Sequence, residues 1–115
     1  MAVSQRKDGD VTVLEFSGPV TIGEGDVAVR ESVQEALEAG EEKVLLDFGG
    51  VTSLDSSGVG ELISAYTSIT NRGGGLKLSR LSPKVDSVLQ VTRLSGILDS
   101  YGSQEEALVA FAQGI

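Results

Sequence analysis

The stretch that most constrains the fold is Lys43–Phe48, KVLLDF, in which apolar residues follow one another almost without interruption. Charged residues precede this run and Gly49-Gly50 follows it. A short run of this kind is typical of a strand that is buried on both faces of a sheet. Because both faces of such a sheet need to be covered, helices are expected on each side of it, which favours an α/β fold.

Strand-like and helix-like patterns alternate along the rest of the chain. A hairpin is expected first, with strands at 3–7 and 11–17 joined by the turn Asp8-Gly9-Asp10. After the hairpin the alternation predicts crossovers between parallel strands, and therefore a mixed sheet of about five strands with about four helices. Further strands are expected at 20–22, 43–48, 76–81 and 97–98, with a short extended segment at 51–54.

Residues that typically cap helices predict where the helices begin and end. Asp26 is the expected N-cap of a helix that ends at Gly40, Pro83 lies in the first turn of another helix, and Ser103 caps the last one. The remaining helix follows Asp55, and its expected buried stripe is Val59, Leu62, Ile63, Tyr66, Ile69 and Thr70. Tyr66 and Tyr101 are expected at the edge of the core, and Arg72, Lys77, Arg80, Lys84 and Arg93 as scattered surface charges.

Length and composition limit the classes of function. At 115 residues the chain is expected to form a single domain over 1–115, with residues 1–3 as a loose N-terminal end. It contains no His and no Cys, so a Ser-His-Asp triad, a thiol nucleophile and a zinc site built from these residues are excluded. The expectation is a protein that is not an enzyme, with no catalytic residues, no metal site and no cofactor.

Charge narrows the choice of partner. The formal net charge is −8, so a nucleic acid would be repelled. The first residues contain no apolar stretch of the signal-peptide type, and no apolar run approaches the roughly 20 residues that span a bilayer. We therefore expect a soluble, cytoplasmic protein with neither a nucleic-acid partner nor a membrane partner.

One glycine motif suggests a nucleotide site. Residues Gly23–Ala28 fit the pattern G-x-G-x-x-A of dinucleotide-binding turns, and Asp47 follows about twenty residues later. Against this interpretation, Glu24 and Asp26 would bring two negative charges to a pyrophosphate. The simpler interpretation is a tight turn that enters a helix, with Asp47 as a solvated or capping acid at the end of a strand.

The stretch Leu54–Leu62 (LDSSGVGEL) is the stronger candidate for a functional site. It contains Asp55, Ser56 and Ser57 at the start of a helix, where unpaired backbone N–H groups and the positive end of the helix dipole favour a phosphate. Helix capping alone would need only one side-chain acceptor. Two glycines, Gly58 and Gly60, further weaken the helix by about 1 kcal/mol each. The spacing alone does not choose between the two serines.

The segment from Leu46 to Leu62, together with the Asn71-Arg72-Gly73-Gly74 turn and the alternating strand after it, resembles the signature of STAS domains, specifically the bacterial anti-sigma factor antagonists. The chain departs from many members of that family at Ile22–Asp26. The resemblance implies that Ser56 is phosphorylated by an anti-sigma factor with serine kinase activity and dephosphorylated by a PP2C-type phosphatase. The unphosphorylated form would bind the anti-sigma factor and so release a sigma factor.

On this hypothesis two loops and the start of the helix face the partner. The expected partner-binding residues are Thr21, Gly23, Glu24, Gly25, Ser53, Asp55, Ser56, Ser57, Gly58 and Glu61. Two alternatives stay open. One is a STAS module without a switch, acting as a scaffold in a stress complex or as the accessory subunit of a lipid transporter. The other is a small-molecule or nucleotide binder that uses the Gly23–Ala28 turn.

Overall fold

A computed structural model describes residues 1–114 of the chain. The strands are β1 (Ala2–Asp8), β2 (Val11–Val20), β3 (Lys43–Leu54), β4 (Gly75–Ser79) and β5 (Asp99–Tyr101). The helices are α1 (Gly25–Glu38), α2 (Ser56–Asn71), α3 (Pro83–Val91) and α4 (Gln104–Ala112), with a short 3₁₀ turn, η1, at Leu94–Gly96. The predicted α/β fold, with a mixed five-stranded sheet and four α-helices, is confirmed.

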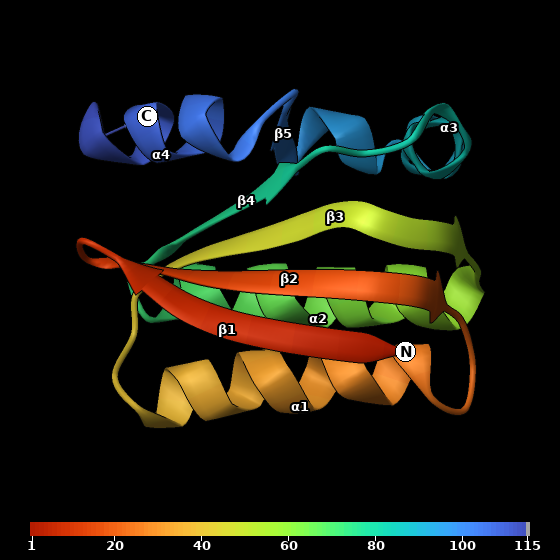
Figure 1. Ribbon diagram of the computed structural model, residues 1–115, viewed down its shortest axis with the longest axis horizontal. Coiled ribbons are helices and arrows are strands. Elements are labelled where there is room, and N and C mark those ends of the chain that lie inside the picture. The colour runs from red at the N-terminus through yellow and green to blue at the C-terminus, as the bar shows by residue number, and fades with distance from the viewer. Residues whose placement is uncertain (115) are drawn as a thin grey trace.

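The sheet has the strand order β1-β2-β3-β4-β5. Strand β1 runs antiparallel to β2, and the other neighbouring strands are parallel to each other. Helices α1 and α2 lie side by side against one face of the sheet, and α4 lies on the other side (Figure 1). Helix α3 follows β4 and packs against β3. This arrangement leaves β1 as an exposed edge strand.

The core consists of two hydrophobic clusters: a large one that includes side chains of α1, α2 and α3, and a small one that includes side chains of α4. Side chains alternate along β3, so that Leu46 belongs to the large cluster beneath α1 and α2, whereas Leu45 belongs to the small cluster beneath α4. The aromatic rings of Phe16 and Phe48 meet edge to face in the large cluster, with centroids 5.7 Å apart. The central apolar run is therefore buried on both faces, as its composition predicts.

The N-terminal hairpin forms as expected, but two neighbouring segments differ from the prediction. Residues 1–3 are not a loose end, because β1 begins at Ala2 and Met1 packs against the large cluster. Residues 20–22 do not form a separate strand. Instead β2 continues through Gly18 and Pro19 to Val20, because its register with β3 shifts once between Glu15 and Ser17 and again between Gly18 and Val20, which accommodates the irregular backbone.

Strand β3 is also longer than its sequence suggests. It does not end at Phe48 but runs through Gly49 and Gly50 to Leu54. Strand β4 pairs only with residues 43–47 of β3, so the last part of β3 is hydrogen-bonded to β2 alone. A two-stranded ribbon consequently extends beyond the five-stranded part of the sheet, and α2 begins at the end of this ribbon.

The helices confirm most of the predicted caps. Ser82 and Ser103 accept hydrogen bonds from the N–H groups of Val85 and Glu106. Helix α1 starts earlier than expected, at Gly25 after Glu24, so Asp26 is not its N-cap. In α2, Ile63 and Thr70 are exposed, and the buried stripe is Val59, Leu62, Ala65 and Ile69. The strand expected at 97–98 lies slightly later, at Asp99–Tyr101.

Candidate functional site

Asp55 connects two loops at the start of α2. It is the N-cap of the helix, and its Oδ1 accepts a hydrogen bond of 3.0 Å from the N–H of Gly58. Its Oδ2 accepts a second hydrogen bond of 3.0 Å, from the N–H of Ile22 in the loop between β2 and α1. The carboxylate therefore holds the 21–25 loop against the first turn of α2.

The electrostatic state of Asp55 follows from these contacts. The N–H groups of Gly58 and Ile22 stabilise the ionised carboxylate, which lowers its pKa below the usual value of 3.8. The side chain of Asp55 is thus negatively charged near neutral pH. Any group attached to the next residue, Ser56, would lie beside that charge.

Ser56 and Ser57 are the first two residues of α2. Ser56 is exposed, whereas Ser57 and Ser53 are half-buried. The different exposure favours Ser56 as the more accessible hydroxyl, a distinction that the sequence spacing does not make. Within the described residues neither serine of the first turn donates a side-chain hydrogen bond, so the Ser56 hydroxyl is not held by another group of the protein.

Two buried glycines explain how the loops come so close. A Cβ on Gly58 would lie 2.3 Å from the carbonyl oxygen of Val20, and a Cβ on Gly25 would lie 2.0 Å from that of Pro19. Both positions therefore exclude any side chain, because atoms do not approach backbone oxygens so closely. Gly60 is different: a Cβ there would meet nothing within 4 Å. Packing accounts for Gly58 and leaves Gly60 unexplained.

The loop with the glycine motif is closed by its own acid. Asp26 is buried, and its Oδ1 accepts hydrogen bonds from the N–H groups of Gly23, at 2.9 Å, and of Val27, at 2.8 Å. These N–H groups are donors of the kind that a nucleotide phosphate would need. Glu24 is exposed and pairs with the N-terminal ammonium group at 3.1 Å. The arrangement thus favours the simpler interpretation of this motif as a helix entry.

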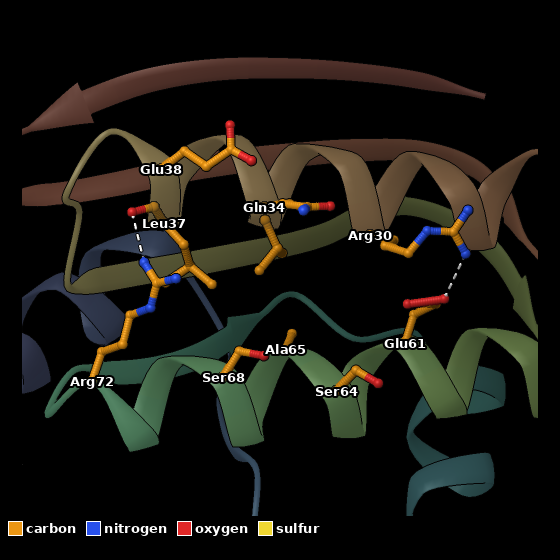
Figure 2. Close-up of a pocket in the computed structure, with 10 residues that line it drawn as sticks. Arg30, Gln34, Leu37, Glu38, Glu61, Ser64, Ala65, Ser68 and Arg72 are labelled. Carbon is orange, nitrogen blue, oxygen red and sulfur yellow. Dashed lines mark hydrogen bonds and ion pairs between the residues drawn. The ribbon is translucent and has the colours of Figure 1, made fainter.

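Glu61 points away from the loops and towards α1. Its carboxylate forms an ion pair of 3.1 Å with Arg30 across a groove of about 330 Å³ between α1 and α2 (Figure 2). At the other end of the groove Arg72 donates a hydrogen bond of 2.9 Å to the carbonyl oxygen of Leu37. Arg72 is exposed, as expected of a surface charge, but it also helps to hold the two helices together.

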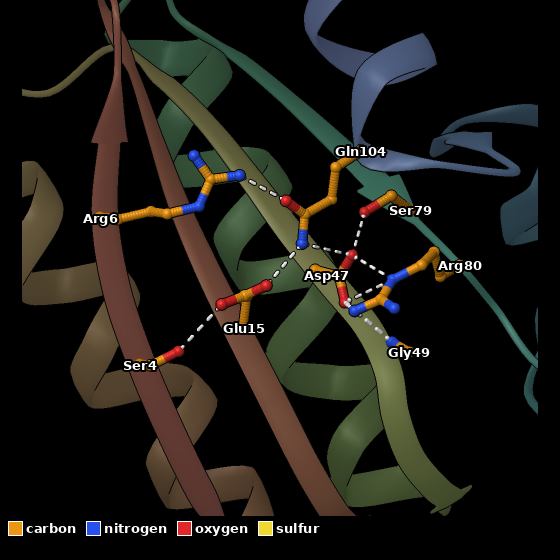
Figure 3. A network of polar contacts seen from close by, with 8 residues as sticks. All are labelled: Ser4, Arg6, Glu15, Asp47, Gly49, Ser79, Arg80 and Gln104. Carbon is orange, nitrogen blue, oxygen red and sulfur yellow. Dashed lines mark hydrogen bonds and ion pairs between the residues drawn. The ribbon is translucent and has the colours of Figure 1, made fainter.

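A second polar cluster surrounds Asp47, on the side of the sheet that faces α4 (Figure 3). Asp47 is only 1% exposed, so the expectation of a solvated acid is wrong. The guanidinium of Arg80 donates hydrogen bonds to both carboxylate oxygens of Asp47, from Nε to Oδ2 at 2.9 Å and from Nη2 to Oδ1 at 2.8 Å. Ser79 and Gln104 donate further hydrogen bonds of 2.8 and 2.9 Å. The cluster joins α4 and the end of β4 to the centre of the sheet.

The charge of Asp47 is maintained despite its burial. Desolvation alone would raise the pKa of this carboxyl, but hydrogen bonds from Arg80, from the N–H of Gly49, from Ser79 and from Gln104 outweigh that effect and lower the pKa. The guanidinium of Arg80 lies directly over Gly49, where a Cβ would come within 2.5 Å of its central carbon. Asp47 and Arg80 form a structural ion pair and not part of the serine site.

The expectation of a surface charge is wrong for Lys77. It is only 3% exposed, and its ammonium group lies 5.2 Å from the ring centroid of Phe111 and 5.4 Å from that of Tyr101. Tyr66 and Tyr101 lie at the edges of the two hydrophobic clusters, as predicted.

Most of the residues predicted to bind a partner lie in two segments that the structure joins. Asp55 connects the 21–25 loop to the 53–58 segment, whereas Glu61 is held by Arg30. Ile22 lies in the first of these segments and was not among the named contact residues; it is 75% exposed although its backbone is fixed by Asp55. No local sequence signal distinguishes Ile22, because its contact is with a residue 33 positions away. Among the described residues, no helix is both long and apolar enough to cross a membrane.

Comparison with known proteins agrees with this geometry. A family model described as "Mlab, STAS domain" matches residues 3–99. The anti-sigma F factor antagonist of Paenibacillus polymyxa is 27% identical over 99 residues, which cover 85% of this chain and 84% of that protein. The crystal structure of a candidate anti-sigma factor antagonist from Thermotoga maritima is 27% identical, with a TM-score of 0.81, over 92% of this chain and 91% of that one.

The fold is also shared with the Bacillus anti-sigma factor antagonist SpoIIAA. Its unphosphorylated form is 20% identical and has a TM-score of 0.74, over 99% of this chain and 100% of that one. Its phosphorylated form gives the same identity and TM-score, over 96% and 99%. Both states of that protein therefore match the present fold equally well.

Proposed function

The chain belongs to the STAS domain family, and on that premise we propose that it is an anti-sigma factor antagonist switched by phosphorylation of Ser56. In its unphosphorylated form it binds an anti-sigma factor that has serine kinase activity, and the bound anti-sigma factor releases its sigma factor. A PP2C-type phosphatase restores the binding form. In this role the protein is a cytoplasmic binding partner and not an enzyme.

The single observation that carries the proposal is the position of Ser56. Its hydroxyl is exposed at the first position of α2, directly after the fixed carboxylate of Asp55. The 21–25 loop lies against the same helix turn, so that a partner reaching Ser56 also meets this loop. The remaining predicted contact residues, namely Thr21, Gly23, Glu24, Gly25, Ser53, Ser57 and Gly58, belong to these two segments. Glu61, the other predicted contact residue, lies outside these two segments in its ion pair with Arg30.

The switch acts through charge and bulk. A phosphate on Ser56 adds about −1.5 to −2 charges at pH 7 next to Asp55, on a protein that already carries −8. A partner surface packed closely against this position is repelled or displaced. The first turn of α2 still offers N–H groups to the phosphate, so the fold need not change.

The proposal is tested by phosphorylation with a purified anti-sigma factor kinase from the same genome. The wild-type protein is incubated with this kinase and ATP, and the modified residue is identified by mass spectrometry. Ser56→Ala should abolish the modification, while Ser57→Ala, the matched control one residue away, should retain it. Modification of Ser57 alone, or no modification by any such kinase, would contradict the proposal.

Partner affinity gives a second measurement. Ser56→Asp should bind the anti-sigma factor more weakly than the wild type, while Ser56→Ala should bind it without being switched off. Both variants should unfold at nearly the wild-type temperature, because the side chain at position 56 is exposed.

The alternative is a STAS module without a switch, which scaffolds a stress complex or serves as an accessory subunit of a lipid transporter. The observation that favours it is the description of the matching family model, which names Mlab and not an antagonist. A protein of this kind binds its partner equally well with Ser56→Asp and with the wild type, so the affinity measurement separates the two functions.

A further inference from the structure

We propose that Ile22 and the bare surface of α2 at Gly60 are the docking contacts for the anti-sigma factor, with Ile22 entering an apolar pocket and Gly60 admitting the partner's backbone next to Ser56. This inference rests on the proposed function and identifies the residues that select the partner. It also assigns the chemistry of the partner surface, which is an apolar pocket that carries no acidic side chains at its rim.

Ile22 combines an exposed apolar side chain with a backbone that is held in place. Its side chain is 75% exposed, although burying an isoleucine is favourable by about 1.5–3 kcal/mol. Its N–H group is held by Asp55 at 3.0 Å. Rigid exposed apolar side chains suit binding, because little conformational entropy is lost when they are covered.

The rest of the loop is fixed as well. The N–H of Asp26 donates a hydrogen bond of 3.0 Å to the carbonyl oxygen of Thr21, and the Asp26 carboxylate holds the N–H of Gly23. Gly25 packs directly on the carbonyl oxygen of Pro19. Ile22 is therefore presented in one position relative to Ser56 before any partner binds.

Gly60 lies on the same face of α2 as the serine. Ser56, Gly60 and Ile63 are spaced by four and three residues, which places them along one side of a helix. Gly60 is exposed and has open space where a Cβ would be, so nothing within the described residues requires a glycine there. Glycine weakens a helix at such a position. Its presence is explained if the space above Gly60 is occupied by the partner.

Ile63 extends this surface. It is 46% exposed, one turn beyond Gly60, so that an apolar side chain follows the gap. A partner lying along this face meets Ser56, then an open space, then Ile63, with Ile22 held beside the start of the helix.

Charge selects the kind of partner. Asp55, whose carboxylate is ionised, accepts a hydrogen bond from the N–H of Ile22, and the exposed acid Glu24 lies two residues after Ile22 in the chain. The whole protein carries −8. A second copy of the chain, or an anionic lipid surface, would be repelled at this position. A protein surface with an apolar pocket for Ile22 and no acidic side chains at its rim is not repelled in this way, and it holds no basic group that would attract a phosphate on Ser56.

The test measures affinity for the anti-sigma factor kinase that modifies Ser56. Ile22→Ala should raise the dissociation constant at least tenfold. The matched control is Val109→Ala, which truncates a 54% exposed apolar residue on α4, on the other side of the sheet, and should change affinity less than twofold. Equal effects of the two substitutions, or a change of less than twofold for Ile22→Ala, would overturn the proposal.

Gly60→Ala separates docking from stability. It should raise the unfolding temperature by a few degrees, because alanine is the better helix former, and yet weaken binding at least threefold. Gly96→Ala, at another open glycine position, should leave binding unchanged. Unchanged affinity of Gly60→Ala would overturn the role of Gly60.

Different outcomes would contradict the proposed function and the docking surface. If the kinase binds and modifies the wild type but tolerates both the Ile22 and Gly60 changes, the proposed function stands and the docking surface is wrong. If no anti-sigma factor kinase binds the wild type, the proposed function fails and the docking inference falls with it.

Discussion

Asp55 and Ile22, 33 residues apart in the chain, are joined by a hydrogen bond of 3.0 Å from the N–H of Ile22 to Oδ2 of Asp55. Because Oδ1 of the same carboxylate caps α2, one side chain fixes both the helix start and the neighbouring loop. The geometry of the partner-facing surface therefore depends on Asp55 more than on either serine beside it.

Removal of this carboxylate should loosen the loop. Asp55→Ala loses the cap and the contact with Ile22, so we expect a lower unfolding temperature and at least tenfold faster hydrogen exchange at the Ile22 amide, measured by NMR. Ser82→Ala, which removes only the cap of α3, should lower the unfolding temperature and leave the Ile22 amide protected. Protection of Ile22 in Asp55→Ala would show that the loop is held by other contacts.

The Asp47 and Arg80 pair should contribute strongly to stability. Arg80→Ala leaves a buried carboxylate without its cation and should lower the free energy of unfolding by about 2–3 kcal/mol, measured by urea denaturation. Arg93→Ala is a matched control. Both arginines have a left-handed backbone, with φ of 56° at Arg80 and 63° at Arg93, but only Arg80 forms an ion pair with Asp47. Similar small losses in the two variants would contradict a structural role for the pair.

Acid should remove the contribution of Asp47. Its pKa is lower in the folded protein than the usual value of 3.8, so the folded state binds the proton less readily than the unfolded chain does. The stabilisation is therefore fully present above the unfolded pKa and is lost as pH falls through the folded pKa. Urea denaturation between about pH 5 and pH 2 should show a smaller acid-induced loss for Asp47→Asn than for the wild type. If the free energy of unfolding fell equally with pH in the two proteins, Asp47 would not be the source of the acid-induced loss.

Two glycines of one helix turn should respond in opposite directions to alanine. Gly58→Ala forces a Cβ against the Val20 carbonyl oxygen and should cost about 1–3 kcal/mol of stability. Gly60→Ala should stabilise the protein by up to about 1 kcal/mol, since its Cβ meets only open space. Thermal unfolding of both variants gives the comparison, and loss of stability in both would mean that Gly60 has a packing role.

The sequence predicted those parts of the fold that depend on local signals. Ser82 and Ser103 lie next to the helices that they cap, and the alternation of strands and helices required a mixed sheet. The boundaries that failed depend on distant contacts. Gly49 and Gly50 resemble the end of a strand, but in the sheet Gly50 passes close to Ser17 of β2, where a Cβ would lie 2.7 Å from the Ser17 side chain.

The distinction between local signals and distant contacts also explains which features of the site were predicted. The Asp55-Ser56-Ser57 segment is contiguous, so its position at a helix start could be predicted. The burial of Asp47 could not, because its cation, Arg80, comes from the end of another strand, 33 residues later. Ile22 gave no signal for the same reason, since only the folded chain brings it to Asp55.

The two-stranded ribbon of β2 and β3 separates the molecule into parts that can change independently. The loops at its end are joined to each other and to α2 by Asp55, while α4 and the end of β4 are joined to β3 by Asp47. New residues at positions 22–24 leave the Asp47 contacts untouched. A scaffold built in this way can evolve toward new partners, or accept grafted loops, without a redesign of its core.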